Sequence, residues 1–400
     1  MPSPSRLVPL WQVHPPVTVP RRLAVNHGLD QTRMKAEHKA RRTFLGAATA
    51  ATTLGFPTVV RAQGPILMRW QSTWRAKDIF HEYATDFARR INDMTGGELR
   101  IEVLPAGAVV PAFGLLDAVT KGALDGGHGV LAYHYSKQNA LALWGSGPAF
   151  GMDAQQLLAW HKYGGGRELL AEVYASVGAN VVSFPYGPMF TQPLGWFKKP
   201  VTKSADLKGL KYRTVGISID LFTALGALVN PLPSSEIVPA MDRGLLDAAE
   251  FNNMSSDRAL GFPDVSKVCM LQSFHQNAEQ FEILFNKTRF DALPGKLKAI
   301  IESGVEAASQ DITWKAIDRY SADYVEMRTA DKVRFYKTPD SVLLDQIKAY
   351  EASVAPRKDN PLFNQILASQ RKFAERVVKW DLDNNVSRRM AYNYYFGRKG

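Results

Sequence analysis

The chain has 400 residues, of which 46% are hydrophobic, and a formal net charge of +11. This length exceeds one average domain, so two packed domains are the first expectation. Residues 1–62 hold nine basic and two acidic side chains, which places +7 in this segment and leaves +4 for the rest. Because the rest has no dense basic run, we do not expect nucleic acid binding. The single cysteine, Cys269, excludes an intramolecular disulfide and lies in the apolar run VCML, as a small buried hydrophobe would.

The N-terminal segment has the layout of an export signal. Residues 1–33 show no periodicity, and Met34 offers a second start site. The twin arginines Arg41-Arg42 precede a mild apolar run over residues 46–60, which is too short and too polar to span a membrane. We therefore predict that residues 1–33 lie upstream of the true start and that residues 34–62 are a Tat-type signal peptide for export to the periplasm.

Strands and helices alternate after the signal. A strand at residues 66–72 leads to an amphipathic helix at residues 79–94, and LRIEVLP forms a second strand that Pro105 ends. A helix at residues 115–121 and a strand at residues 126–130 complete a βαβαβ unit. This order predicts a parallel or mostly parallel sheet with right-handed crossovers.

A second α/β unit is expected after residues 184–188, FPYGP, which have the composition of a linker. It runs from Gly195 to about Gln276, and a strand follows at residues 281–286. Long amphipathic helices are predicted for three C-terminal ranges, namely residues 295–336, 339–354 and 360–380.

The predicted fold class is α/β, with two domains, a hinge and a ligand cleft between them. Domain I takes residues 65–186 and 277–320, and domain II takes residues 187–276 and 321–358. Residues 359–400 form a C-terminal helix and tail, which either packs back across both domains or packs on a second copy.

The chain is organised around residues 211–253, where strand, helix, strand, helix and strand follow one another. In open α/β sheets ligands bind outside the carboxyl ends of the strands, and Arg213 and Glu250 both stand at such ends. The sequence has no GxGxxG, GK[ST] or GxSxG motif and no paired histidines at zinc spacing. Enzymatic chemistry therefore has no candidate, and a binding site is favoured.

Four segments resemble the DctP-like solute-binding proteins of TRAP transporters, and the resemblance covers nearly all of residues 65–380. They are ELRIEVLPAG, PMFTQPLGWFKKPV, DLKGLKYRTVG and LDAAEF. The combination of Gln192 with Glu250 and Phe251 is similar to the subgroup that binds 2-oxo or 2-hydroxy acids together with a metal ion.

The resemblance implies a role for each of these residues. Arg213 would form a two-pronged salt bridge with the substrate carboxylate, which suits a planar, always charged guanidinium. Gln192, Glu250 and the carbonyl of Phe251 would hold Na⁺ or Ca²⁺ through oxygen atoms. With Arg213, Glu250 and a monocarboxylate, Na⁺ gives a neutral site and Ca²⁺ gives +1, which favours Na⁺ slightly. Other members have Trp where this chain has Phe251, which puts the pocket shape in doubt.

Several further side chains are expected near the cleft. Tyr133 and Tyr135 follow a domain I strand and are predicted to line the cleft from the other side. His275 is a candidate substrate-binding residue. It and Gln276 either contact a substrate tail or satisfy loop backbone groups.

The function predicted is a periplasmic receptor, not an enzyme, that captures a pyruvate-like or lactate-like acid and delivers it to a membrane permease. The resemblance also implies a homodimer with exchanged C-terminal helices. One alternative is a metal-free receptor for an aromatic acid or for a dicarboxylate, whose second basic group would have to come from Lys137 or Arg258. The others are a metal-dependent periplasmic enzyme and a receptor that serves a signalling partner.

Overall fold

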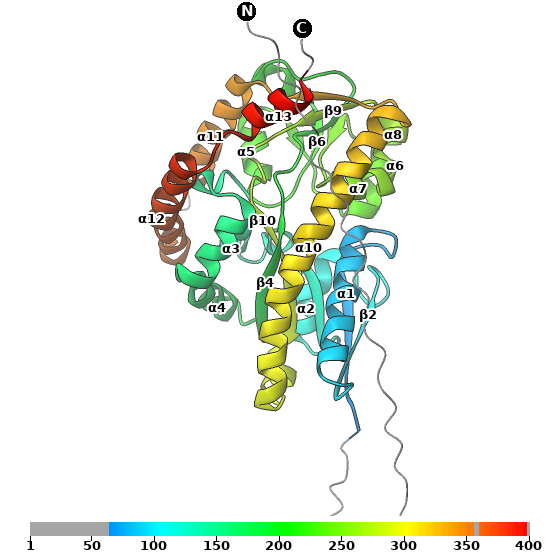
Figure 1. The fold of residues 1–400 in the computed structure, drawn as a ribbon, viewed down its shortest axis with the longest axis vertical. Coiled ribbons are helices and arrows are strands. Elements are labelled where there is room, and N and C mark those ends of the chain that lie inside the picture. Colours follow the sequence, from blue (N-terminus) through cyan, green and yellow to red (C-terminus); the bar gives the residue numbers. More distant parts are fainter. Residues whose placement is uncertain (1–63, 356–359, 398–400) are drawn as a thin grey trace, which may run out of the picture. The chain divides into compact units, whose positions relative to one another are not determined.

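The computed structural model describes residues 64–355 and 360–397, and these residues belong to one compact unit (Figure 1). The predicted upstream segment and signal peptide, residues 1–33 and 34–62, lie outside the described residues. Among the helices that are described, none is both long enough and apolar enough to cross a membrane.

The first sheet has the strand order β2-β1-β3-β10-β4 within the described residues. The strands are β1 (Ile66–Ser72), β2 (Leu99–Leu104), β3 (Gly126–Val130), β4 (Val181–Met189) and β10 (Glu279–Asn286). Strands β1, β2 and β3 pair in parallel, but β10 is antiparallel to both β3 and β4. The sheet is therefore mixed and not mostly parallel, because β10 returns from the second half of the chain in the opposite direction.

The second sheet has the order β11-β9-β5-β8-β6-β7 in the described part of the chain. The strands are β5 (Gly195–Phe197), β6 (Lys211–Arg213), β7 (Leu228–Val229), β8 (Ala248–Ala249), β9 (Val268–Leu271) and β11 (Arg334–Lys337). Strand β5 is antiparallel to β8 and β9, and the remaining pairs are parallel. These two sheets with covering helices confirm the predicted α/β class.

Two sequence predictions about this region are wrong. Residues 184–188 belong to strand β4 and not to a linker, and the chain crosses to the second sheet only after Met189. Proline is tolerated there because β4 is an edge strand of its sheet. The helix predicted to reach residue 336 ends at Thr329, since the short run RFYK pairs with β9 as β11.

The helices cover both sheets. They are α1 (Ile79–Met94), α2 (Leu115–Thr120), α3 (Ala154–Tyr163), α4 (Gly166–Ser176), α5 (Ser218–Ala224), α6 (Ser234–Asp242), α7 (Met254–Leu260), α8 (Phe262–Val265), α9 (Lys287–Asp291), α10 (Gly295–Thr329), α11 (Asp340–Val354), α12 (Pro361–Asn384) and α13 (Arg388–Phe396). Helix α10 contacts β4 and α1 of the first half and α7 of the second (Figure 1).

The apolar core joins the two sheets. One buried cluster includes Trp70 and Ile283 of the first sheet together with Trp196 of the second, and the other cluster also draws on both sheets. Such shared burial holds the carboxyl ends of strands from both sheets around one site.

Helix α12 packs on its own chain. Its buried side chains, among them Phe363 and Ile366, lie against α3, α4 and the short 3₁₀ helices η3 (Asn139–Trp144) and η4 (Ala149–Gly151). By contrast, no residue of α13 is buried. Of the two placements considered for the C-terminal segment, α12 therefore takes the one within the chain.

Candidate functional site

The central stretch forms β6, α5, β7, α6 and β8, as its sequence predicts. Arg213 is the last residue of β6, and Glu250 directly follows β8. These strands pair in parallel with Arg213 opposite Ala249, so both side chains leave the sheet at the same edge. The two charged groups thus lie together at the ends of neighbouring strands, which is where the sequence put them.

Strand β5 approaches β8 so closely that only glycine fits at its first position. Gly195 has a φ of +130°, and a Cβ atom there would lie 2.5 Å from the carbonyl oxygen of Ala249. This close approach fixes the backbone that carries Glu250.

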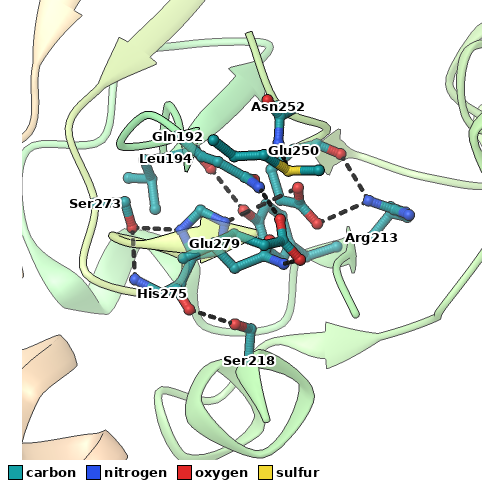
Figure 2. Close-up of polar contacts among 12 residues, drawn as sticks. Gln192, Leu194, Arg213, Ser218, Glu250, Asn252, Ser273, His275 and Glu279 are labelled. Atoms are coloured by element: carbon teal, nitrogen blue, oxygen red, sulfur yellow. Dashed lines mark hydrogen bonds and ion pairs between the residues drawn. The ribbon is translucent and has the colours of Figure 1, made fainter. Parts of the chain in front are cut away.

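Arg213 and Glu250 form a buried ion pair (Figure 2). Nη1 of Arg213 donates to Oε1 of Glu250 at 2.8 Å and to the Glu250 carbonyl at 3.2 Å. Nε donates to the Leu232 carbonyl at 2.8 Å, and Nη2 has no partner. The pair was not foreseen from the sequence. It holds the guanidinium in place and leaves one amino group to bind an anion.

A second buried carboxylate, Glu279, lies next to this pair. Its Oε2 accepts a hydrogen bond from Nε2 of Gln192 at 2.8 Å, and its Oε1 accepts one from Nε2 of Gln276 at 3.2 Å. Sequence reasoning missed Glu279. The only signal was an acidic residue at the start of the run EQFEILFN, which becomes the fully buried strand β10.

The surroundings of Glu279 act on its charge. Burial raises the pKa of Glu279 to about 8, and the charge of Glu250 adds to this rise. The Arg213 charge and the hydrogen bonds from Gln276 and Gln192 oppose it. Burial also raises the pKa of Tyr133 to about 12 against the opposing charge of Arg213, so its hydroxyl remains a donor at neutral pH.

Arg213, Tyr133 and Glu279 border a small cavity of about 20 Å³. This is enough room for one water molecule or one monatomic ion. Its walls combine apolar and polar side chains, namely Trp74, Phe80, Val130, Tyr133, Met189, Arg213, Val215, Phe251, Asn252, Gln276 and Glu279. The wall of this cavity thus contains three residues predicted for the site, namely Arg213, Tyr133 and Phe251. The apolar side chains that the first half contributes to the wall were not predicted.

Four residues predicted for the site do not line this cavity, namely Gln192, Glu250, Tyr135 and His275. The hydroxyl of Tyr135 donates to the carboxylate of Asp220. His275 is buried, its Nδ1 lies 2.6 Å from Oγ of Ser273, and its unpartnered Nε2 lies 3.9 Å from Oε2 of Glu250.

The oxygen atoms of the site fit a hard cation. Within residues 64–355 and 360–397 no three His, Cys, Asp or Glu side chains are grouped to hold a metal. Yet Oε1 of Gln192, Oε1 of Gln276 and Oε2 of Glu250 are buried without a hydrogen-bond partner. Carboxylate and amide oxygens are ligands that Na⁺ and Ca²⁺ accept. Coordination by the Phe251 carbonyl stays a prediction.

The two basic side chains considered for a dicarboxylate are engaged elsewhere. Lys137 pairs with Asp117 in an exposed ion pair. Arg258 pairs with three acidic residues, Asp323, Glu326 and Asp331. Neither lines the cavity, so Arg213 is the basic residue of its wall.

The model of a protein family described as bacterial extracellular solute-binding protein, family 7 (DctP), matches residues 71–356. The chain belongs to this family. Members are solute-binding proteins of TRAP transporters, and both the family and the fold are those of receptors, not of enzymes.

Individual relatives agree with this assignment. A monocarboxylate 2-oxoacid-binding periplasmic protein of Nostoc sp. is 28% identical over 342 residues, which cover 85% of this chain and 90% of the relative. A TRAP solute-binding protein of Bordetella bronchiseptica, a mixed-occupancy dimer with calcium and picolinate in one site and an apo second site, is 26% identical with a TM-score of 0.78, covering 84% and 98% of the two chains. One of Pseudoalteromonas atlantica with bound sodium and pyruvate is 27% identical with a TM-score of 0.76, covering 83% and 99%.

The buried ion pair makes a testable contribution to stability. We expect Arg213→Met to lower the free energy of unfolding of the solute-free protein by about 3–5 kcal/mol, because Glu250 is left buried without its counter-charge. The double variant Arg213→Met/Glu250→Gln should recover part of this loss. Urea unfolding measures both.

The control is an exposed ion pair on the same sheet, Lys198 with Asp247. Lys198→Met should cost at most about 1 kcal/mol. Equal losses in the single and the double Arg213 variants would show that uncompensated charge is not the cause.

Proposed function

We propose that this protein is the periplasmic substrate-binding subunit of a TRAP transporter for a small 2-oxo or 2-hydroxy monocarboxylate, such as pyruvate or lactate, bound together with Na⁺ or Ca²⁺. After export by residues 34–62 it delivers this solute to the membrane permease. The observation that carries the proposal is the partly free guanidinium of Arg213 beside three buried oxygens without partners.

Each group of the site has a defined part in this proposal. The solute carboxylate binds Nη2 of Arg213. Oε2 of Glu250, Oε1 of Gln192 and the carbonyl of Phe251 would hold the cation, and oxygen atoms of the solute would complete its ligands. When bound, the cation supplies positive charge between an anionic solute and Glu250, which would otherwise repel each other in a dry site.

The apolar walls select for a short solute. Trp74, Phe80 and Val130 face the cavity and suit a methyl group. The cavity of about 20 Å³ holds no more than one water molecule or one ion, so a solute can enter only when the two halves separate. The sodium and pyruvate of the Pseudoalteromonas protein and the name of the Nostoc relative support this choice.

Solute entry requires the half built on the first sheet and the half built on the second to separate at a hinge, which the chain crosses after Met189 and again before Glu279. Several hydrogen bonds join these halves, among them the one from Gln192 to Glu279. Nη2 of Arg75 donates to the Ser235 carbonyl at 2.7 Å, and Oγ of Ser256 donates to Oδ1 of Asp78 at 2.9 Å. Periplasmic binding proteins are known to close around their ligands by such a hinge motion.

Titration calorimetry with pyruvate, longer 2-oxo acids and lactate tests the proposal. The protein is first freed of cations by chelation and sodium removal, and Na⁺ or Ca²⁺ is then restored. We expect binding only with a cation, and Arg213→Ala should weaken it by about 2–5 kcal/mol because the solute carboxylate loses its partner.

Glu250→Gln tests the cation in the same assay. This variant should bind pyruvate weakly, and excess cation should restore part of the affinity. Tight binding without any cation would favour the metal-free receptor for an aromatic or other organic acid. Turnover of any of these acids would favour the enzyme.

We further propose a homodimer in which α13 packs on a second copy. The end of α12 and helix α13 expose a run of large apolar side chains, namely Trp380, Leu382, Val386, Met390, Tyr392, Tyr394, Tyr395 and Phe396. This much apolar surface on one segment is unusual for a monomer. The dimer of the Bordetella relative supports the proposal.

Analytical ultracentrifugation of the mature chain should show a dimer at micromolar concentration, and truncation after Asn385 should give a monomer with an unchanged melting temperature. Trp314→Ala, which removes an exposed tryptophan on α10, is the control and should leave the dimer intact. A monomeric mature chain, or a truncated chain that still dimerises, would contradict this assembly.

A further inference from the structure

The turn between β6 and α5 contacts the first half of the molecule at Gly216. This residue is buried and has a φ of +66°. A Cβ atom built there would lie 2.2 Å from Oγ of Ser146, and 3.4 Å from the Cβ atoms of Ala132 and of Ser146. Two carbon atoms pack best at about 3.5–4.0 Å, so the space at Gly216 is full before a side chain extends beyond Cβ.

Ala132 and Ser146 belong to the half built on the first sheet. Ala132 lies in the 3₁₀ helix η2 (Leu131–His134), which directly follows β3 and packs on η3 and β10. Ser146 lies between η3 and η4. Gly216 follows β6 and therefore belongs to the half built on the second sheet. The contact at Gly216 thus joins the two halves that must separate for solute entry.

This contact continues into the wall of the solute cavity. Tyr133 is next to Ala132 in η2, and it lines the cavity. Val215 is next to Gly216 in the turn, and it lines the cavity together with Arg213. When η2 seats on the turn, it therefore brings Tyr133 into the same cavity wall as the guanidinium that is proposed to bind the solute carboxylate.

The contact also lies close to the place where the chain crosses between the halves. Gly147, next to Ser146, pairs with Gln276 in an isolated β-bridge, and its N–H donates to the carbonyl of His275 at 2.5 Å. Strand β10 begins shortly after Gln276. Rotation about a hinge moves distant atoms through longer arcs than near ones. A side chain at position 216 would therefore hold the mouth of the cleft open by more than its own width.

We propose that Gly216 is a positioning residue for solute binding, whose missing side chain lets η2 and Ser146 seat on the turn after β6 so that the cleft closes around the solute and its cation. The inference rests on the proposed function, since it concerns closure of the same site. Gly216 does not line the cavity and acts through the fit between the halves.

The variant Gly216→Asn fills this space with little backbone strain, because asparagine tolerates the left-handed region better than most side chains. In titration calorimetry of the mature protein with pyruvate and the cation that supports binding, its dissociation constant should rise by about 100-fold or more. The reason is that apparent affinity scales with the fraction of molecules that can close. Small-angle X-ray scattering should show that pyruvate and cation compact the unaltered protein but not the variant.

Gly244→Asn is the matched control for backbone strain. Gly244 lies in the same half and has a φ of +71°, and within the described residues no atom of another segment lies within 4 Å of a Cβ built there. This variant should bind pyruvate as the unaltered protein does. Without a solute the halves are apart, so both variants should unfold at similar urea concentrations.

A rescue experiment tests the contact itself. Gly216→Ala brings only the Cβ atom, whose close approach is to Oγ of Ser146, and it should weaken pyruvate binding by about tenfold. Oγ of Ser146 has no hydrogen-bond partner in the described part of the chain, so Ser146→Ala removes it without breaking a bond. The double variant Gly216→Ala/Ser146→Ala should regain the affinity of the unaltered protein.

Three results would overturn the inference. They are an unchanged dissociation constant in Gly216→Asn, an equal rise in Gly244→Asn, and a loss in Gly216→Ala that Ser146→Ala does not reduce. A purely structural role of Gly216 would give the last of these, because the backbone strain at position 216 is the same in the single and the double variant.

The same calorimetry separates this inference from the proposed function. Cation-dependent pyruvate binding that Gly216→Asn leaves unchanged keeps the function intact and removes the role of Gly216. Absence of cation-dependent acid binding in the unaltered protein removes the proposed function, and the inference with it.

Discussion

The buried ion pair between Arg213 and Glu250 is the constraint on which the site depends. Two opposite charges without contact to water are stable only when each is paired and hydrogen-bonded. Here Nη1 of Arg213 contacts Oε1 of Glu250, and Nη2 of Arg213 and Oε2 of Glu250 have no hydrogen-bond partner. One unpartnered donor and one unpartnered acceptor on the same buried ion pair suit an anion and a cation bound together.

Strand topology brings this pair about. Parallel pairing of β6 with β8 sets the two residues at one edge, and the antiparallel strand β10 carries Glu279 to the same place from the other sheet. The site is therefore shared between strands of both sheets. The proposed ligands of the solute and the cation all lie between Met189 and Glu279 in the chain, and closure adds Glu279 and the apolar walls of the first half.

The local part of this structure could be predicted from the sequence. The alternation of β6, α5, β7, α6 and β8 depends on turns and apolar spacing within residues 211–253, and strand ends then placed Arg213 and Glu250. What could not be predicted depends on distant partners. Glu279 meets Gln192 across 87 positions of the chain, β11 exists only because β9 offers an edge, and β4 accepts its prolines because it pairs on one side alone.

The crystal structure of the mature protein grown with pyruvate and Ca²⁺ tests the central claim most directly. The account predicts the pyruvate carboxylate within hydrogen-bond distance of Nη2 of Arg213. It also predicts an ion at about 2.3–2.6 Å from Oε2 of Glu250 and Oε1 of Gln192, the range of calcium–oxygen bonds. Pyruvate bound away from Arg213, or bound there with no ion near Glu250, would contradict the account.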